Sequence, residues 1–158
     1  MDLRDRLVSG IGGGLLGGVV FALVLQAAGR IDSVALLVAD ESTALGWTTL
    51  LVITGVLGLV YGLTFGRLPH TWLRGAGYGL AHGVIWWILG VLLIMPLWVG
   101  YPIGTFGEAT WFNLLGYVLY GLVTGLVTAA VAQRGSQEAP TSPEAATEDR
   151  RERADADA

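Results

Sequence analysis

The chain has 158 residues, of which 53% are hydrophobic and 14% are charged, and its formal net charge is −4. In soluble domains about a quarter of the residues are charged. The lack of cysteine excludes disulfides, thiolate chemistry and cysteine-based metal sites. The acidic excess lies in residues 135–158, so the rest of the chain presents no large charged face to a nucleic acid or another macromolecule.

Four stretches of the chain carry no charged residue: 7–29, 42–66, 75–107 and 109–133. Each is long enough for a helix of about 20 apolar residues, which crosses a hydrocarbon core of about 30 Å. We predict an all-α, multi-pass membrane protein, in which residues 1–134 form a four-helix transmembrane bundle. The predicted spans are 7–28, 46–66, 73–99 and 111–132. Four spans leave no room for a soluble catalytic domain.

The first span, 7–28, has two interpretations. Arg4 and Arg6 precede an apolar stretch, as in a signal peptide, and small residues follow at its end. The apolar stretch is longer than the usual signal core of about 7–15 residues. We therefore predict a retained span, followed by a loop at 30–45 whose apolar centre forms a short helix at the membrane interface.

Arginine placement predicts the orientation, because basic residues favour the cytoplasmic side of short loops. Five arginines mark one side of the predicted bundle: Arg4, Arg6, Arg67, Arg74 and Arg134. The other side carries a single arginine and several acids: Arg30, Asp32, Asp40, Glu41 and Glu108. We predict a cell-membrane protein with both termini in the cytoplasm. Residues 135–158 are too polar to bury a core and are predicted to form a disordered acidic cytoplasmic tail.

Two weak internal repeats suggest that the bundle consists of two helical hairpins in the same orientation. The glycines at Gly10, Gly14 and Gly18 recur at an offset of 65 as Gly75, Gly79 and Gly83. The segment that begins with Tyr61 and Gly62 recurs at an offset of 59 as Tyr120 and Gly121. Repeats of this kind are common in transporters, but a duplicated hairpin without transport activity gives the same pattern.

Glycines at four-residue spacing form the best-defined pattern. The predicted helix-packing residues are Gly10, Gly14, Gly18, Gly58, Gly62, Gly66, Gly75, Gly79, Gly83, Gly121 and Gly125. Helices in lipid associate through close packing, which small residues permit. Two interpretations remain open: tight packing within one four-helix bundle, and a seam between copies of the chain.

His82 is the one ionisable residue deep inside a predicted span, about 12 Å along the helix from Arg74. An intramembrane ionisable group is a functional candidate by default. Tyr78, His82 and Trp86 share one helical stripe, and together they form the candidate functional or polar core. The alternative is a neutral core histidine that hydrogen-bonds to a tyrosine hydroxyl or a backbone carbonyl.

His82 also allows three functional hypotheses. Imidazole suits haem iron, but the second histidine, His70, falls in an inner loop, so two axial ligands would require two copies of His82 face to face in a symmetric dimer. A metal or proton relay would lack an intramembrane carboxylate partner. A polar contact along a substrate path is the third hypothesis. Pro96, near the outer end of the third span, should bend or end that helix.

The segment from Gly77 to Trp87, with His82 at its centre and Met95 and Pro96 beyond it, resembles small uncharacterised four-helix membrane proteins of haloarchaea and related prokaryotes. The resemblance covers mainly the third span and the four-span layout, and it implies no known activity.

We therefore expect a small membrane interaction or accessory protein without enzymatic activity, cofactor or bound metal. Its expected partners are the lipid bilayer and either a further copy of the chain or another membrane protein. An oligomeric transporter or channel with His82 near the path is the first alternative, and a haem or redox protein is the second. An enzyme is disfavoured because the sequence contains no nucleophile–base pair, no carboxylate pair and no phosphate-binding loop.

Overall fold

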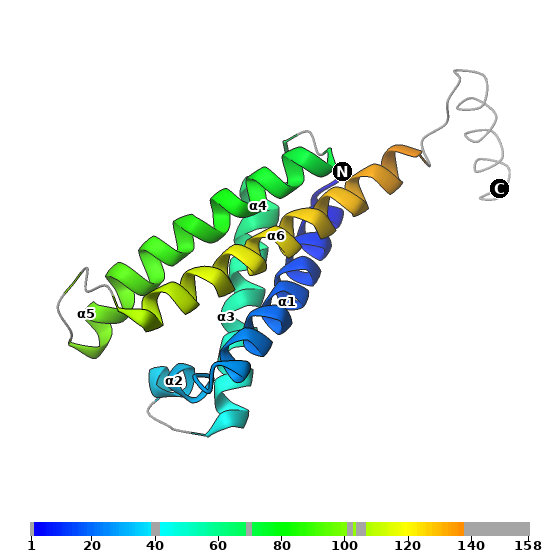
Figure 1. Ribbon diagram of the computed structural model, residues 1–158. Helices are drawn as coiled ribbons and strands as arrows, with labels where there is room; N and C mark the ends of the chain where they lie inside the picture. The colour runs from blue at the N-terminus through cyan, green and yellow to red at the C-terminus, as the bar shows by residue number, and fades with distance from the viewer. Residues whose placement is uncertain (1, 39–41, 69–70, 101–102, 104–106, 138–158) are drawn as a thin grey trace, which may run out of the picture.

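The computed structural model describes residues 2–38, 42–68, 71–100, 103 and 107–137. Every regular element within these residues is helical, and four helices are long and apolar enough to cross a membrane (Figure 1). The predicted all-α architecture with four spans is confirmed. The spans run Leu3–Ala27, Thr43–Thr64, Trp72–Trp98 and Thr110–Gly135, with mean hydropathies between 1.8 and 2.1.

The first hairpin consists of α1 (Leu3–Ala27) and α3 (Thr43–Thr64), joined by the short α2 (Asp32–Ala35) and the 3₁₀ turn η1 (Leu36–Val38). Side chains of the preceding residues cap both long helices: Asp2 accepts from the Asp5 amide at 2.7 Å, and Ser42 accepts from the Leu45 amide at 3.3 Å. The short helix expected in the loop at 30–45 is present as α2, which packs against α3.

The second hairpin begins with one long, composite helix. It comprises α4 (Trp72–Trp86), the π-helix η2 (Trp87–Ile94) and α5 (Met95–Val99), and it is followed by α6 (Glu108–Gln137). The hydroxyl of Thr71 caps α4 by accepting from the Arg74 amide at 3.3 Å. The helix α6 continues three residues past the boundary predicted at 134, and the predicted tail from residue 138 onward lies outside the described residues.

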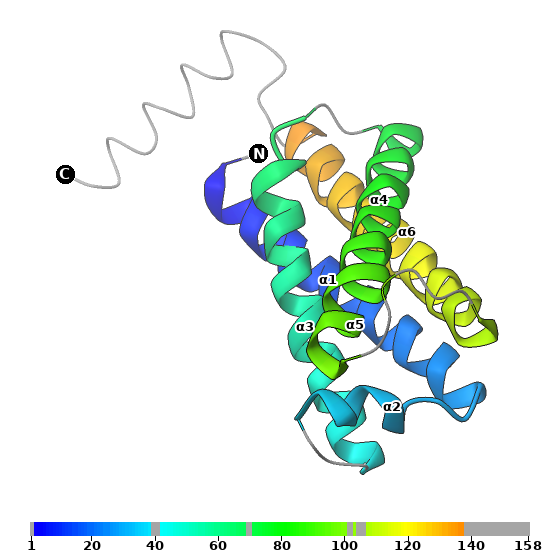
Figure 2. The same ribbon diagram turned by 90° about the vertical axis from the view of Figure 1, so that its left-hand side faces the viewer.

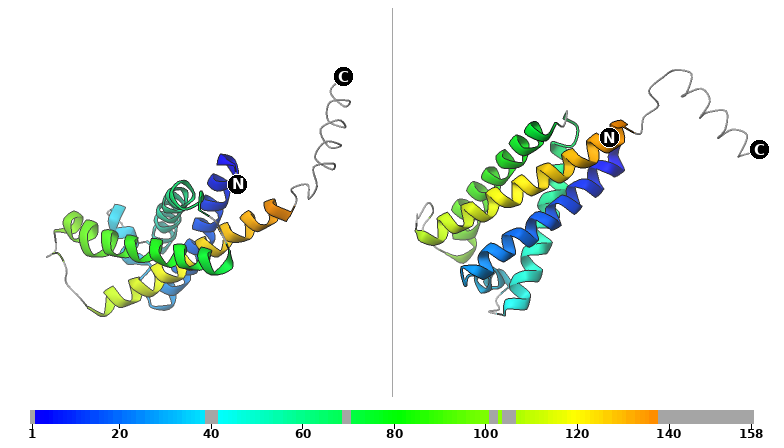
Figure 3. Two further views of the ribbon diagram at one scale, coloured as in Figure 1. Left: turned by 90° about the horizontal axis from the view of Figure 1, so that it is seen from above. Right: turned by 45° about the vertical axis from the view of Figure 1, so that its right-hand side comes forward.

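The four long helices form a curved row rather than a square bundle. The helix α1 packs against α3 on one side and α6 on the other, and α6 packs in turn against α4 (Figure 2). The N-terminus, the end of α3 and the end of α6 lie at one end of the molecule, and α2 and α5 lie at the other (Figure 3). The five arginines predicted to face the cytoplasm lie in the sequence next to the helix ends at the first of these two ends, as the orientation prediction requires.

Glycine contacts join α1 to α3 at very short range. A methyl group added at Gly14 would lie 2.5 Å from the Thr54 carbonyl oxygen and 2.7 Å from the Gly58 Cα. Gly10 meets Gly58 and Gly62 in the same way. These helices therefore touch backbone to backbone, the close approach that glycine permits in a membrane.

An equivalent seam joins α4 to α6, where Gly79 faces the backbone of Gly121 and Gly75 faces that of Gly125. The other face of α1 also contacts α6, because Gly17 lies against Tyr120. Three further predicted glycines meet non-glycine neighbours: Gly18 meets the Thr54 side chain, Gly66 meets the Arg6 side chain, and Gly83 meets the Tyr117 backbone. The predicted packing glycines are thus engaged within one chain.

The two glycine seams differ in register by two helical turns. A methyl group added at Gly14 would meet the Gly58 Cα, and at the repeat offsets of 65 and 59 this contact would recur between Gly79 and Tyr117. A methyl group added at Gly79 would instead meet the Gly125 Cα, eight residues further along α6. The repeat therefore predicts which helices pair through glycine but misplaces their register, because both helices carry glycine on consecutive turns.

Candidate functional site

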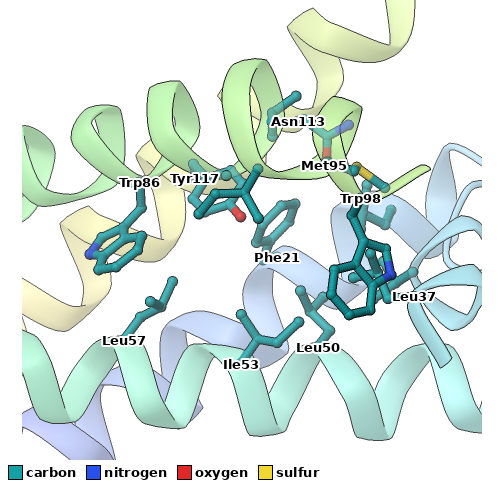
Figure 4. Close-up of a pocket in the computed structure, with 15 residues that line it drawn as sticks. Phe21, Leu37, Leu50, Ile53, Leu57, Trp86, Met95, Trp98, Asn113 and Tyr117 are labelled. Atoms are coloured by element: carbon teal, nitrogen blue, oxygen red, sulfur yellow. The ribbon is translucent and has the colours of Figure 1, made fainter. Parts of the chain in front are cut away.

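An apolar cleft of about 330 Å³ lies between α3 and the η2–α5 segment (Figure 4). Leu50, Ile53 and Leu57 line it from α3, and Phe21 of α1 and Tyr117 of α6 form its floor. The composite helix diverges from α3 toward α5 (Figure 1), while the two helices meet through side chains nearer to α4. The cleft is therefore wide at the α2–α5 end and narrow near the middle of the bundle.

The walls of the cleft are almost entirely hydrocarbon and aromatic. Phe21, Leu25 and Leu50 are each at most 4% exposed, and Trp86 and Met95 add large polarisable surfaces. No charged residue lines the cleft among the described residues. The lining residues with a polar side-chain group are Asn113, Tyr117, Trp86 and Trp98. A lining with this chemistry favours apolar groups over polar ones.

His82 closes the narrow end of the cleft. Its Nε2 lies 3.1 Å from the carbonyl oxygen of Leu57, and Leu57 itself lines the cleft. The side chain is 2% exposed. This contact requires Nε2–H to donate, so the neutral ring carries its acceptor at Nδ1. The hydrogen bond ties α4 to α3 across the bundle, in agreement with the interpretation of His82 as a core histidine bound to a backbone carbonyl.

Aromatic rings surround His82. The ring centroid of Tyr61 lies 5.1 Å from that of His82, and Trp86 and Tyr120 lie 6.2 Å and 6.1 Å away. Tyr78 joins the cluster through Phe65, with which it stacks at 5.9 Å. The predicted stripe of Tyr78, His82 and Trp86 therefore faces one aromatic cluster, and Trp86 also lines the cleft.

Two repeat-related tyrosines in this cluster have different hydrogen bonding. The Tyr120 hydroxyl donates to the Thr54 carbonyl oxygen at 3.4 Å. The Tyr61 hydroxyl is buried and has no hydrogen-bond partner among the residues that the structure describes. A buried polar group without a partner is costly, so Tyr61 is the one member of the cluster whose hydroxyl does not support the packing.

The π-helix η2 forms one wall of the cleft. In it the Met95 amide donates to the Gly90 carbonyl, five residues earlier, and π-turns of this kind are frequent at functional sites. Of the two effects expected of Pro96, a bend or an end of the helix, the second does not occur: α5 continues to Val99, and the left-handed Gly100, at φ 84°, ends it. The wider turns before Pro96 accommodate a residue that cannot complete an α-helical hydrogen bond.

The position of His82 bears on the haem hypothesis. Its imidazole is buried inside its own chain and engaged with Leu57. Two copies of His82 therefore cannot face each other across a dimer interface without repacking of α3 and α4. His70 lies outside the described residues. Within the described part of the chain, no three His, Cys, Asp or Glu side chains gather in a way that could hold a metal ion.

The fold and the site together define a polytopic helical membrane protein with an apolar cleft in its transmembrane region. No known protein family matches the chain, and neither does a curated protein or a solved structure. The cleft was not predicted from the sequence. The only signal for it is Gly90, a small residue on the glycine face of the third span, which now lies opposite the Tyr117 hydroxyl.

Proposed function

We propose that this chain is a small membrane accessory protein that works by binding, and that its binding site is the cleft between α3 and η2–α5. The observation that carries the proposal is the combination of volume and lining: about 330 Å³ bounded by apolar side chains inside the transmembrane region. Ligand pockets begin at about 300 Å³. If an apolar space of this size stayed empty, the side chains that line it would lose dispersion contacts.

The rigid half of the bundle supports this function. The hydrogen bond between His82 and Leu57 holds the narrow end of the cleft together, and the glycine seams fix α3 to α1 and α4 to α6. At the wide end α3 and α5 diverge (Figure 1). A guest can therefore enter from the side without disturbing the contacts that hold the helices.

Photo-crosslinking tests the proposal. The protein in vesicles is exposed to an alkyl probe that carries a diazirine at the end of its chain, and the modified residues are mapped. We expect crosslinks at cleft residues such as Trp86, Ile53 and Val91. The variant Ile53→Trp fills the cleft and should lose them, whereas Ile88→Trp, on the exposed face of η2, should keep them.

Two outcomes would contradict the proposal. One is a crosslinking pattern spread evenly over the exposed faces of all four helices. The other is an equal yield of cleft crosslinks in wild type and in Ile53→Trp, with both proteins folded by circular dichroism and size-exclusion chromatography.

The transporter alternative rests on a different observation, the buried and unpartnered Tyr61 hydroxyl beside His82. A path through the bundle would extend the cleft past the bond between His82 and Leu57 and use that hydroxyl as a polar contact. Flux in proteoliposomes that changes in His82→Ala would support this alternative. Equal flux in protein-free and protein-containing vesicles would remove it.

A further inference from the structure

We infer that the cleft holds one acyl chain of a zwitterionic phospholipid from the leaflet at the α5 end, with the lipid phosphate at Arg30. This inference rests on the proposed binding function and specifies its ligand. Three properties of the cleft lead to it: its depth, its volume and the charges at its wide end.

The depth of the cleft matches that of a lipid chain in one leaflet. Trp98 lines the wide end of the cleft and is 73% exposed. Tryptophan favours the headgroup level of a membrane. On α3 the lining extends from Leu50 to Leu57, about 10 Å along the helix axis. Leu57 lies about 17 Å along α3 from Gly46, where the predicted span begins, so the narrow end lies close to the midplane of a core of about 30 Å. The cleft is thus parallel to the lipid chains and about as deep as one leaflet.

The volume of the cleft suits a hydrocarbon chain. An engineered apolar cavity of about 150 Å³ already holds benzene. The cleft provides about 330 Å³, so it has room for a flexible chain several carbons longer.

The charges at the wide end fit a phospholipid head. Arg30 lies in the chain between Leu25 and Val34, both of which line the cleft. Its guanidinium carbon is 5.7 Å from the ring centroid of Phe112, the neighbour of the lining residue Asn113. A guanidinium matches the geometry of a phosphate, to which it offers parallel N–H donors.

Acidic residues at the same end favour a head that also carries a positive charge. Asp32, whose carboxylate accepts from the Thr43 hydroxyl at 2.6 Å, is exposed there, and Glu108 begins α6. A phosphate at Arg30 beside a cationic ammonium group near these carboxylates balances the charges. A net anionic head would leave the carboxylates unpaired and repelled.

Native mass spectrometry of protein reconstituted with a single defined lipid tests the inference. Protein from phosphatidylcholine vesicles should retain one lipid after detergent extraction, and protein from phosphatidylglycerol vesicles should retain severalfold less. Gly90→Leu, which places a side chain in the cleft, should lower retention about tenfold. Gly77→Leu is the matched control, because an added group there meets no atom within 4 Å. Arg30→Gln should lower retention severalfold.

Retention that is equal in wild type and in a folded Gly90→Leu protein would overturn the inference, as would preferential retention of phosphatidylglycerol. Ile53→Trp, with Ile88→Trp as its control, replaces the glycine pair if Gly90→Leu fails to fold. If alkyl crosslinks map to the cleft but no phospholipid is retained, the binding function survives and the phospholipid assignment fails. If neither result is obtained, both proposals fail.

Discussion

His82 donates from Nε2 to the carbonyl oxygen of Leu57 over 3.1 Å, and this contact joins α4 to α3. Leu57 lines the cleft on one side of the bond, and Tyr61 packs against the imidazole on the other. The bond thus separates an apolar cleft from an aromatic core. Its contribution to folding is measurable independently of any ligand.

Replacement of His82 tests that contribution. His82→Ala removes a buried hydrogen bond and leaves a cavity among Tyr61, Trp86 and Tyr120, so we expect a loss of about 1–3 kcal/mol in unfolding free energy. His82→Gln restores a donor at similar reach and should recover part of the loss. Denaturant unfolding in detergent micelles gives both values. An unfolding free energy of His82→Ala equal to that of wild type would show that the bond adds nothing.

Two pairs of neighbouring glycines provide internally controlled tests of the helix seams. Gly14→Leu and Gly79→Leu force side chains against the backbones of Gly58 and Gly121, and each should cost about 3 kcal/mol or more. Gly12→Leu and Gly77→Leu point into open space, and they should be neutral or slightly stabilising because glycine disfavours helix. Thermal unfolding with size-exclusion chromatography checks this. Similar melting temperatures within each pair would contradict the seams.

The two repeat-related tyrosines should respond in opposite directions to loss of the hydroxyl. Tyr120→Phe removes the bond to the Thr54 carbonyl and should lower the unfolding free energy by about 0.5–1 kcal/mol. Tyr61→Phe removes a buried hydroxyl that has no partner, so it should leave stability unchanged or raise it. A larger loss for Tyr61→Phe than for Tyr120→Phe would mean that the Tyr61 hydroxyl is bound.

The orientation predicted from the arginines can be tested with single cysteines, since the chain has none of its own. Ser33→Cys lies at the α2 end, and Gly135→Cys lies at the end where α1 begins and α6 ends. A membrane-impermeant maleimide added to intact cells should label only Ser33→Cys. Both should react after the membrane is opened. Labelling of Gly135→Cys alone in intact cells would show the opposite orientation.

Sequence reasoning predicted the spans because charge-free stretches and helix length are local properties. The glycine faces were equally visible, and the structure places them at the α1–α3 and α4–α6 contacts. Register was not predictable: glycine occurs on successive turns of α4 and of α6, so more than one register brings glycines together, and long-range packing decides.

Almost no feature of the sequence indicates the cleft. It arises because η2 adopts π-turns and the composite helix diverges from α3, and neither feature has a periodic signature. The hydrogen-bond partner of His82 could not be predicted either, because a backbone carbonyl such as that of Leu57 is present at every position of a helix. The sequence therefore identified the residue but not its contact.

Quenching of Trp86 fluorescence tests the central claim, occupation of the cleft by a lipid chain, most directly. The protein is reconstituted in phosphatidylcholine with bromine near the chain ends, and the emission of Trp86 is taken as the difference between wild type and Trp86→Phe. We predict strong quenching of Trp86 in wild type and in Gly77→Leu, and little in Gly90→Leu, because only the last blocks the cleft. Equal quenching of Trp86 in wild type and Gly90→Leu, or none in wild type, would contradict the account.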